Sequence, residues 1–203
     1  MSYAYVRNGT VRREYATLPD TFDNVSYPAG LSETERNALG LYAVIDVAPT
    51  LSEFESANRA LTFNAGQQTV TAVYEIEAFN LPKVRRLLRK KIEGLRDAAL
   101  AGGCKVLIGA QDRWIPTTVE SKVQIAGMVA LGNNLPAGLR VKDLEDNLIA
   151  VNVARALTIL TAIMNREATV FDHAEALLSA VNASGTPATV DVESGWPESY
   201  VAP

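Results

Sequence analysis

The sequence predicts an α+β fold, in which a small β-rich module precedes a helical module with short β-hairpins and a long C-terminal helix. Over about the first eighty residues, apolar and polar side chains alternate with the period of two that is typical of strands. From Pro82 onward the apolar residues recur every three or four positions, which is the helical period. We therefore expect a docking module over 1–80, a helical module over 81–183 and an extended tail over 184–203.

The first module begins with a predicted β-hairpin. Its strands, over 3–6 and 10–16, flank Asn8-Gly9, the dipeptide that most readily adopts the positive φ angles of a two-residue turn. After the hairpin, the turn-forming residues of 18–30 predict irregular backbone.

A short helix and further strands complete the first module. Ser32 precedes Glu35 by three residues, which is the spacing of a capping box, and Gly40 can end a helix in the left-handed conformation. We therefore expect a helix over 33–39. The remaining strands are predicted over 41–47, 60–64 and 69–78.

The second module is predicted to begin with an amphipathic helix. Pro82 suits the first helical turn, where its missing N–H costs nothing, and Gly102-Gly103 ends the helix after about twenty residues. The elements expected after it are short strands over 105–108 and 113–115, a helix over 119–131 capped by Thr118, a hairpin of 139–144 and 147–151, and a helix over 153–182 capped by Asn152.

The last predicted helix carries an apolar stripe along its whole length, with members spaced by threes, fours or sevens. The stripe consists of Val153, Leu157, Leu160, Met164, Phe171, Leu178 and Val181. The helix that begins at Pro82 is shorter and would leave about ten residues of this stripe uncovered. We therefore expect self-association in a parallel bundle of two or three copies. The interface candidates on this helix are Leu157, Leu160, Met164, Phe171 and Leu178.

The final segment, 184–203, mixes Ser, Gly, Thr and Pro with two aromatic residues. This composition predicts an extended chain that drapes over a neighbouring subunit or stays mobile. Its interface candidates are Trp196 and Tyr200.

Charge is distributed unevenly along the chain. The net charge is −4, but the run 83–91 holds six of the 19 basic residues, so the remainder sums to −10. A basic helix can meet an acidic protein surface, anionic lipid or nucleic acid, or can present a solvated face. Because the rest of the chain is acidic, we expect an acidic neighbouring subunit, and neither nucleic acid nor a membrane, as the partner. The candidates are Lys83, Arg85, Arg86, Arg89 and Lys90.

One cysteine and one histidine limit the chemistry open to the chain. They can form neither an intrachain disulfide nor a structural zinc site. Catalysis by a nucleophile and a histidine would depend on His173, which could pair with Asp172 or Glu175, but we interpret it as a surface or partly buried residue. Cys104 is interpreted as a small buried residue rather than a reactive thiol.

Carboxylates gather at 143–146, where Asp143, Glu145 and Asp146 could bind a hard cation. Their spacing does not match a calcium loop, which favours a solvated turn. We expect no enzyme activity, no metal and no cofactor.

The sequence shows no targeting or membrane-spanning pattern. Its first residues lack a basic segment followed by an apolar stretch, and no run of about 18 apolar residues occurs. We expect synthesis in a reducing cytoplasm.

The order of these elements resembles bacteriophage tail proteins. The resemblance lies in the basic amphipathic helix, the run Gly102-Gly103-Cys104-Lys105-Val106-Leu107-Ile108-Gly109, the stretch Gln124-Ile125-Ala126-Gly127, the acidic hairpin and the long closing helix. Residues 81–183 are similar to a domain of unknown function often found at the end of tail-fibre-associated and tail-fibre-assembly proteins. The opening Tyr-Ala-Tyr-Val-Arg-Asn-Gly-Thr-Val resembles their small N-terminal module. The resemblance implies a role in the virion or in tail assembly, and it brings no catalytic residues.

The favoured hypothesis is a structural protein of the virion tail, made in the cytoplasm of the bacterial host. It would be a baseplate/tail-fibre adaptor or fibre-base component that acts by assembly with other tail proteins. A tail-fibre assembly chaperone is the alternative. A small hydrolase or metal-dependent enzyme, using His173 or the 143–146 carboxylates, is a less favoured one.

Overall fold

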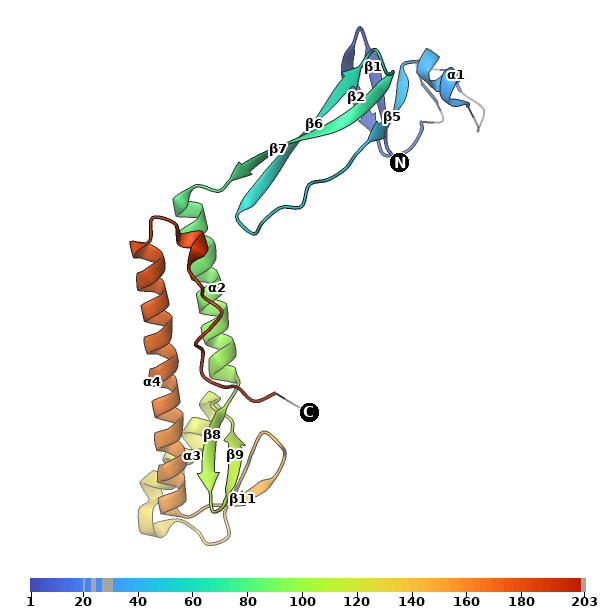
Figure 1. The fold of residues 1–203 in the computed structure, drawn as a ribbon. Helices are drawn as coiled ribbons and strands as arrows, with labels where there is room; N and C mark the ends of the chain where they lie inside the picture. Colours follow the sequence, from blue (N-terminus) through green and yellow to red (C-terminus); the bar gives the residue numbers. More distant parts are fainter. Residues whose placement is uncertain (20, 23–24, 27–30, 202–203) are drawn as a thin grey trace. The chain divides into compact units, whose positions relative to one another are not determined.

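The computed structural model describes residues 1–19, 21–22, 25–26 and 31–201 (Figure 1). The fold is α+β, as predicted. The chain divides into two compact units, Met1–Phe79 and Asn80–Pro203.

The first unit is built around a five-stranded sheet with the strand order β2-β1-β5-β7-β6 (Figure 1). Neighbouring strands are antiparallel except β5 and β7, which are parallel. The strands of this sheet are β1 (Tyr3–Arg7), β2 (Thr10–Tyr15), β5 (Leu41–Ile45), β6 (Glu55–Asn64) and β7 (Thr69–Ala78). Between β2 and β5 the chain forms β3 (Thr21–Phe22), β4 (Val25–Ser26) and helix α1 (Glu33–Ala38).

Local sequence signals account for the turn and the cap of this unit. Asn8 and Gly9 have φ angles of 54° and 74°, so the predicted hairpin is confirmed. Ser32 and Glu35 form the predicted capping box: the N–H of Glu35 donates to the Ser32 hydroxyl, and the N–H of Ser32 donates to the Glu35 carboxylate at 2.8 Å. At Gly40, with φ 76°, a Cβ would lie only 2.6 Å from a backbone oxygen, so glycine is required there.

Two strands differ in length from the prediction. β5 ends at Ile45, two residues before the predicted end. β6 begins at Glu55 instead of Ala60, because its polar first half pairs in full register with β7. Segment 18–30, predicted to be irregular, contains the two-residue strands β3 and β4, and residues 20, 23–24 and 27–30 lie outside the described part of the chain.

A charged network joins the two edge strands of the sheet, β2 and β6. Arg59 on β6 donates to both carboxylate oxygens of Glu14 on β2, each at 2.7 Å, and to Asp46 at 2.9 Å. The hydroxyl of Tyr74 donates to the other oxygen of Asp46 at 2.5 Å. The hydrogen bond from Arg59 lowers the pKa of Glu14, and the hydrogen bond from Tyr74 lowers the pKa of Asp46. The network therefore holds together edges that the strand ladder leaves unpaired.

The second unit is organised by two long antiparallel helices, α2 (Leu81–Ala101) and α4 (Val153–Ala183) (Figure 1). Arg85, near the start of α2, donates to the backbone oxygen of Ser184, just after α4, at 3.0 Å. Arg166 of α4 donates to the backbone oxygen of Ala99, near the end of α2, at 2.8 Å. The other elements are β8 (Cys104–Ile108), β9 (Gln111–Ile115), α3 (Val119–Leu131), the 3₁₀ turn η1 (Gly132–Asn134), β10 (Arg140–Lys142), β11 (Leu148–Ala150) and the 3₁₀ turn η2 (Pro187–Thr189).

The predicted helix boundaries of this unit are confirmed. Asn80, Thr118 and Asn152 each accept, with the side-chain oxygen, the backbone N–H three residues later. Gly102 and Gly103, the latter with φ 71°, end α2. The β8–β9 and β10–β11 hairpins occupy the predicted positions.

The buried face of α4 differs from the predicted apolar stripe. The residues that α4 buries are Ala156, Ile159, Ile163, Val170, Ala174 and Val181, and only Val181 belonged to the predicted stripe. The positions of the neighbouring elements decide which face of α4 is buried, because α2, α3 and β8 all contact the same face. The buried alanines, Ala156 and Ala174, let these elements approach closely. α3 and β8 cover the buried face of α4 together with α2, whereas Leu157, Met164 and Phe171 of the predicted stripe remain half exposed.

The described part of the final segment, 184–201, packs on its own unit, rather than being mobile or draped over a neighbour. Pro187 and Val192 are buried. The ring of Trp196 meets His173 edge-on, with 4.7 Å between ring centroids. The N–H of Tyr200 donates to the backbone oxygen of Gly102 at 2.9 Å. The segment thus lies along α2 and α4 (Figure 1).

Arg166 fixes the end of this segment. Its guanidinium donates to the backbone oxygen of Glu198 and, at 3.1 Å, to the hydroxyl of Ser199, as well as to α2. Gly102 allows the close approach, because a Cβ there would lie 2.4 Å from the Ser199 side chain. One arginine therefore joins α4, the end of α2 and the final segment.

Replacing Gly195 with Ala should loosen the final segment and lower the free energy of unfolding by about 1–2 kcal/mol. Gly195 has φ 83°, and a Cβ there would lie 2.8 Å from Cε1 of His173. Gly185→Ala is the matched control, because nothing lies within 4 Å of the Cβ position and the φ is ordinary. Urea unfolding measures both variants, and equal losses would contradict this account of the segment.

Candidate protein-interaction surface

Helix α4 carries an exposed apolar row beside its buried face. Leu157, Met164 and Phe171 leave 52, 54 and 50 % of their surface exposed, and Leu178 is partly buried. A spacing of seven residues keeps helical side chains nearly in line, with a drift of about 20° per heptad. We call these four residues the α4 seam. Leu160, also predicted at the interface, is partly buried and packs against the core of the unit.

Helix α3 adds a second exposed apolar row. Val119 and Val123 are each 66 % exposed, and Ala126 and Ala130 are exposed on the same side of the helix. We call these four residues the α3 row. Sequence reasoning missed it, although one signal was present: α3 has no polar side chain from Ile125 to its end.

An ion pair places the α3 row next to the α4 seam. The Lys122 ammonium lies 2.5 Å from the Glu167 carboxylate, which joins α3 to α4. Val119 is three residues before Lys122, and Met164 is three residues before Glu167, so each is a surface neighbour of the pair on its own helix. The two rows therefore border the same ion pair. Apolar side chains that gather on a solvent-exposed face in this way are typical of a protein–protein contact.

Phe171 also takes part in a contact within the unit. The guanidinium carbon of Arg96, on α2, lies 5.8 Å from the centre of its ring. This cation–π contact holds the ring in place while half of its surface stays exposed. In the α4 seam, α2 therefore contacts one side of Phe171, and the other side faces solvent.

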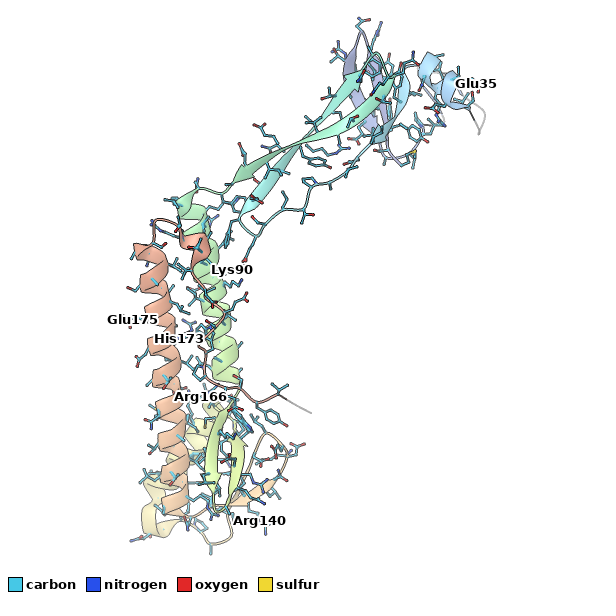
Figure 2. The ribbon with its side chains drawn as sticks, viewed as in Figure 1. Glu35, Lys90, Arg140, Arg166, His173 and Glu175 are labelled. Atoms are coloured by element: carbon cyan, nitrogen blue, oxygen red, sulfur yellow. The ribbon has the colours of Figure 1, made fainter. Side chains whose placement is uncertain are left out.

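The basic face of α2 is partly used within the unit. Arg85 bonds to the backbone after α4, and Lys91 forms an ion pair of 2.7 Å with Glu193. The predicted basic interface residues that remain exposed are Arg86, Arg89 and Lys90, whereas Lys83 is partly buried. Figure 2 labels Lys90 on α2. These cations occupy the first half of the helix, where the helix dipole disfavours positive charge, so helix stability does not account for them.

His173 serves the final segment. Its Nε2 lies 3.1 Å from the backbone oxygen of Ser194, and its ring packs against Trp196. The ring thus meets a backbone carbonyl instead of the carboxylates of Asp172 or Glu175. Figure 2 labels His173 and Glu175 on α4; residues two apart on a helix do not face each other. These contacts give His173 a structural role.

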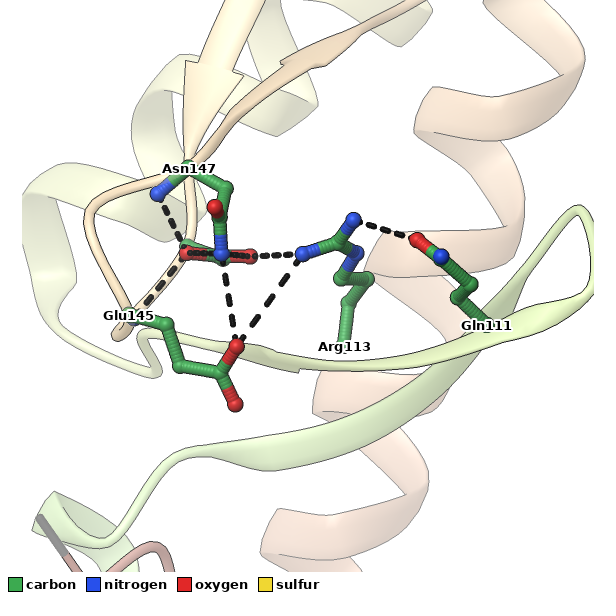
Figure 3. Close-up of polar contacts among 5 residues, drawn as sticks. Gln111, Arg113, Glu145 and Asn147 are labelled. Carbon is green, nitrogen blue, oxygen red and sulfur yellow. Dashed lines mark hydrogen bonds and ion pairs between the residues drawn. The ribbon is translucent and has the colours of Figure 1, made fainter. Parts of the chain in front are cut away.

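Of the three carboxylates of the β10–β11 turn, Glu145 and Asp146 are exposed, as the prediction of a solvated turn requires, but Asp143 is buried in a polar network (Figure 3). The side chain of Asp143 is fully buried and accepts the N–H groups of Glu145 and Asn147 at 2.9 and 2.8 Å. Nη1 of Arg113, on β9, donates to the same carboxylate at 3.4 Å, and Arg113 also donates to Gln111. The network ties the two hairpins together. Within the described ranges, no group of three His, Cys, Asp or Glu side chains could hold a metal ion.

Cys104 is buried, as predicted. Burial raises the pKa of its thiol to about 11, and the positive charge of Arg166 opposes this shift. Such a thiol is a poor nucleophile near neutral pH. Among the helices of the described chain, none is both long and apolar enough to cross a bilayer.

Cys104 should react slowly with Ellman's reagent at pH 8 in the folded protein and rapidly in urea, because burial both shields the thiol and keeps it protonated. The folded state should lose stability as the pH rises from about 9 through about 11, since the thiol of the unfolded chain ionises first. A Cys104→Ala variant should lack this part of the pH dependence. Rapid reaction of the folded protein at pH 8 would refute the prediction.

Neighbouring residues on α4 should differ sharply in their effect on folding. Ile163→Ala should lower the free energy of unfolding by about 2–5 kcal/mol, because Ile163 is fully buried. Met164→Ala should cost less than about 1 kcal/mol, because Met164 lies in the α4 seam. Denaturation of both variants by urea checks the assignment. The opposite order would show that the seam is the folding core.

Comparison with protein families gives a match over residues 83–194, to a family described as a domain of unknown function, DUF4376. The matched region contains α3, both small hairpins, α4 and most of α2, and therefore the α4 seam and the α3 row. Comparisons with curated proteins and with solved structures found no match. Since the match extends over more than half of the chain, the protein belongs to the DUF4376 family.

Proposed function

We propose that the protein is a structural component of a bacteriophage tail, either an adaptor between the baseplate and a tail fibre or a part of the fibre base. It acts in the virion tail by protein–protein assembly and forms a homo-oligomer of two or three copies. The resemblance of the sequence to phage tail proteins supports the tail assignment. The observation that carries an assembly role is the exposed apolar surface formed by the α4 seam and the α3 row.

Two surfaces of different chemistry fit a protein that joins more than one neighbour. The α4 seam is apolar and follows a heptad spacing, which suits a helix as its partner. Arg86, Arg89 and Lys90 form a basic surface on α2, which suits an acidic subunit of the tail. The first unit supplies a separate module for docking on a further tail protein.

The side chains that a hydrolase would need make structural contacts within the fold. Asp143 holds the turn of a hairpin, and His173 holds the final segment. These contacts favour assembly over catalysis.

Mass spectrometry of purified tailed particles, from cells that carry this gene, tests the proposal. The protein should be present in washed particles in a fixed ratio to the baseplate proteins. Deletion of the gene should give tails without fibres in electron micrographs, and a plasmid copy should restore them. Absence from the particles, with binding to the fibre protein in the lysate, would support the assembly chaperone instead. Infectious particles of normal appearance after deletion would refute both roles.

A further inference from the structure

We infer that the α4 seam binds the same seam of a second copy of the chain, with the two α4 helices antiparallel and the two-fold axis between Met164 and Ala168. The inference rests on the proposed assembly function and specifies the partner and the orientation. It is carried by the order of side-chain sizes along the exposed flank of α4.

Large and small residues alternate along this flank. The large residues of the seam are separated by Thr161, Ala168 and Glu175, all exposed. The successive spacings are four and three residues, which is the pattern of a coiled-coil contact surface. Every large side chain of the seam is therefore next to a position with a smaller or polar side chain.

Among pairs with two-fold symmetry, only the antiparallel one matches large residues with small ones. About the proposed axis, Met164 lies opposite Ala168 of the second copy, and Phe171 lies opposite Thr161. Each layer of the pair then contains one large and one small side chain, which fills space evenly, as in protein interiors. In a parallel pair of equal register, Met164 would face Met164, and Ala168 would face Ala168, which gives crowded and empty layers in turn.

Charge favours the same orientation. In a parallel pair, Glu175 would face Glu175 of the second copy between two apolar layers, where like charges repel and lose water. In the antiparallel pair, Glu175 lies opposite Leu157 of the second copy, and the two Glu175 carboxylates are about 27 Å apart at 1.5 Å per residue. The contact from Leu157 to Glu175 is about 27 Å long at 1.5 Å per residue.

The α3 row adds to the centre of this contact. Val119 borders the ion pair of Lys122 and Glu167, and Glu167 lies beside the proposed axis. A second α4 helix on the seam would therefore also approach Val119 and Val123, which are each 66 % exposed. The ion pair itself would lie at the edge of the contact, as in coiled coils with flanking salt bridges.

Cysteine cross-linking of the full chain tests the orientation. Leu157→Cys and Glu175→Cys are made in separate chains, one with a tag that changes its mass, and the two are refolded together with a short bis-maleimide. We expect cross-links between the two variants and little cross-linking of Leu157→Cys with itself, because those positions are about 27 Å apart in an antiparallel pair. The parent chain is one control, since its Cys104 is buried. Ala176→Cys, exposed on another side of α4, is the matched control.

Light scattering of the full chain tests the contact itself. The parent should be a dimer, and Met164→Glu should weaken dimerisation at least tenfold, whereas Ala176→Glu should not. Unfolding in urea confirms that both variants remain folded. The inference would be overturned if the parent chain were a monomer or a trimer, or if Leu157→Cys cross-linked with itself. A different tail protein bound to the seam would overturn it as well. A dimer that is absent from tail particles would leave the pairing intact and refute the proposed function instead.

Discussion

Burial of one face of α4 is the constraint on which the second unit depends. Ile159, Ile163 and Val170 are fully buried. Three elements, α2, α3 and β8, cover the face of α4 on which they lie. α2 lies along the C-terminal half of the helix, and α3 and β8 lie along the other half. A helix of 31 residues is long enough to need this division, because neither α2 nor α3 reaches from one end to the other. The packing of these helices and β8 determines where the remaining elements of the unit can lie.

Polar groups complete the packing where apolar contact ends. Arg166 joins three parts of the second unit through backbone oxygens. Asp143 accepts two backbone N–H groups of its own turn and the guanidinium of Arg113 on β9, which joins the two hairpins. In the first unit, Arg59 connects strands that share no ladder. In each case a single charged side chain binds several partners that lie far apart in the sequence. Residues that a search for catalysis would select from the sequence are therefore largely occupied in holding the fold together.

The sequence predicted those features that are decided within a few residues. The hairpin turn at Asn8-Gly9, the capping box at Ser32 and the glycines after α2 follow from local backbone preferences, and the structure confirms them. The buried face of α4 could not be predicted in this way. The helix has apolar residues on two adjacent flanks, and only the positions of α2, α3 and β8 decide which flank is buried. Burial of Asp143 and the course of the final segment likewise depend on partners distant in the sequence. The candidate surface was thus half predicted: its residues on α4 were named for a partner, but the α3 row beside them was missed.

The course of the final segment has a consequence for how copies of the chain can combine. Residues 184–201 fill the groove of the α2–α4 pair on the side of His173, and the α4 seam lies on another flank. A long helix with an apolar surface on two sides can associate without limit, because each added copy leaves one apolar side exposed for the next copy. Because the final segment occupies one side of the α2–α4 pair, the α4 seam is the apolar flank of α4 left for another copy. The seam-to-seam pair that we propose would occupy this flank in both copies, so α4 would form a closed pair and not a filament.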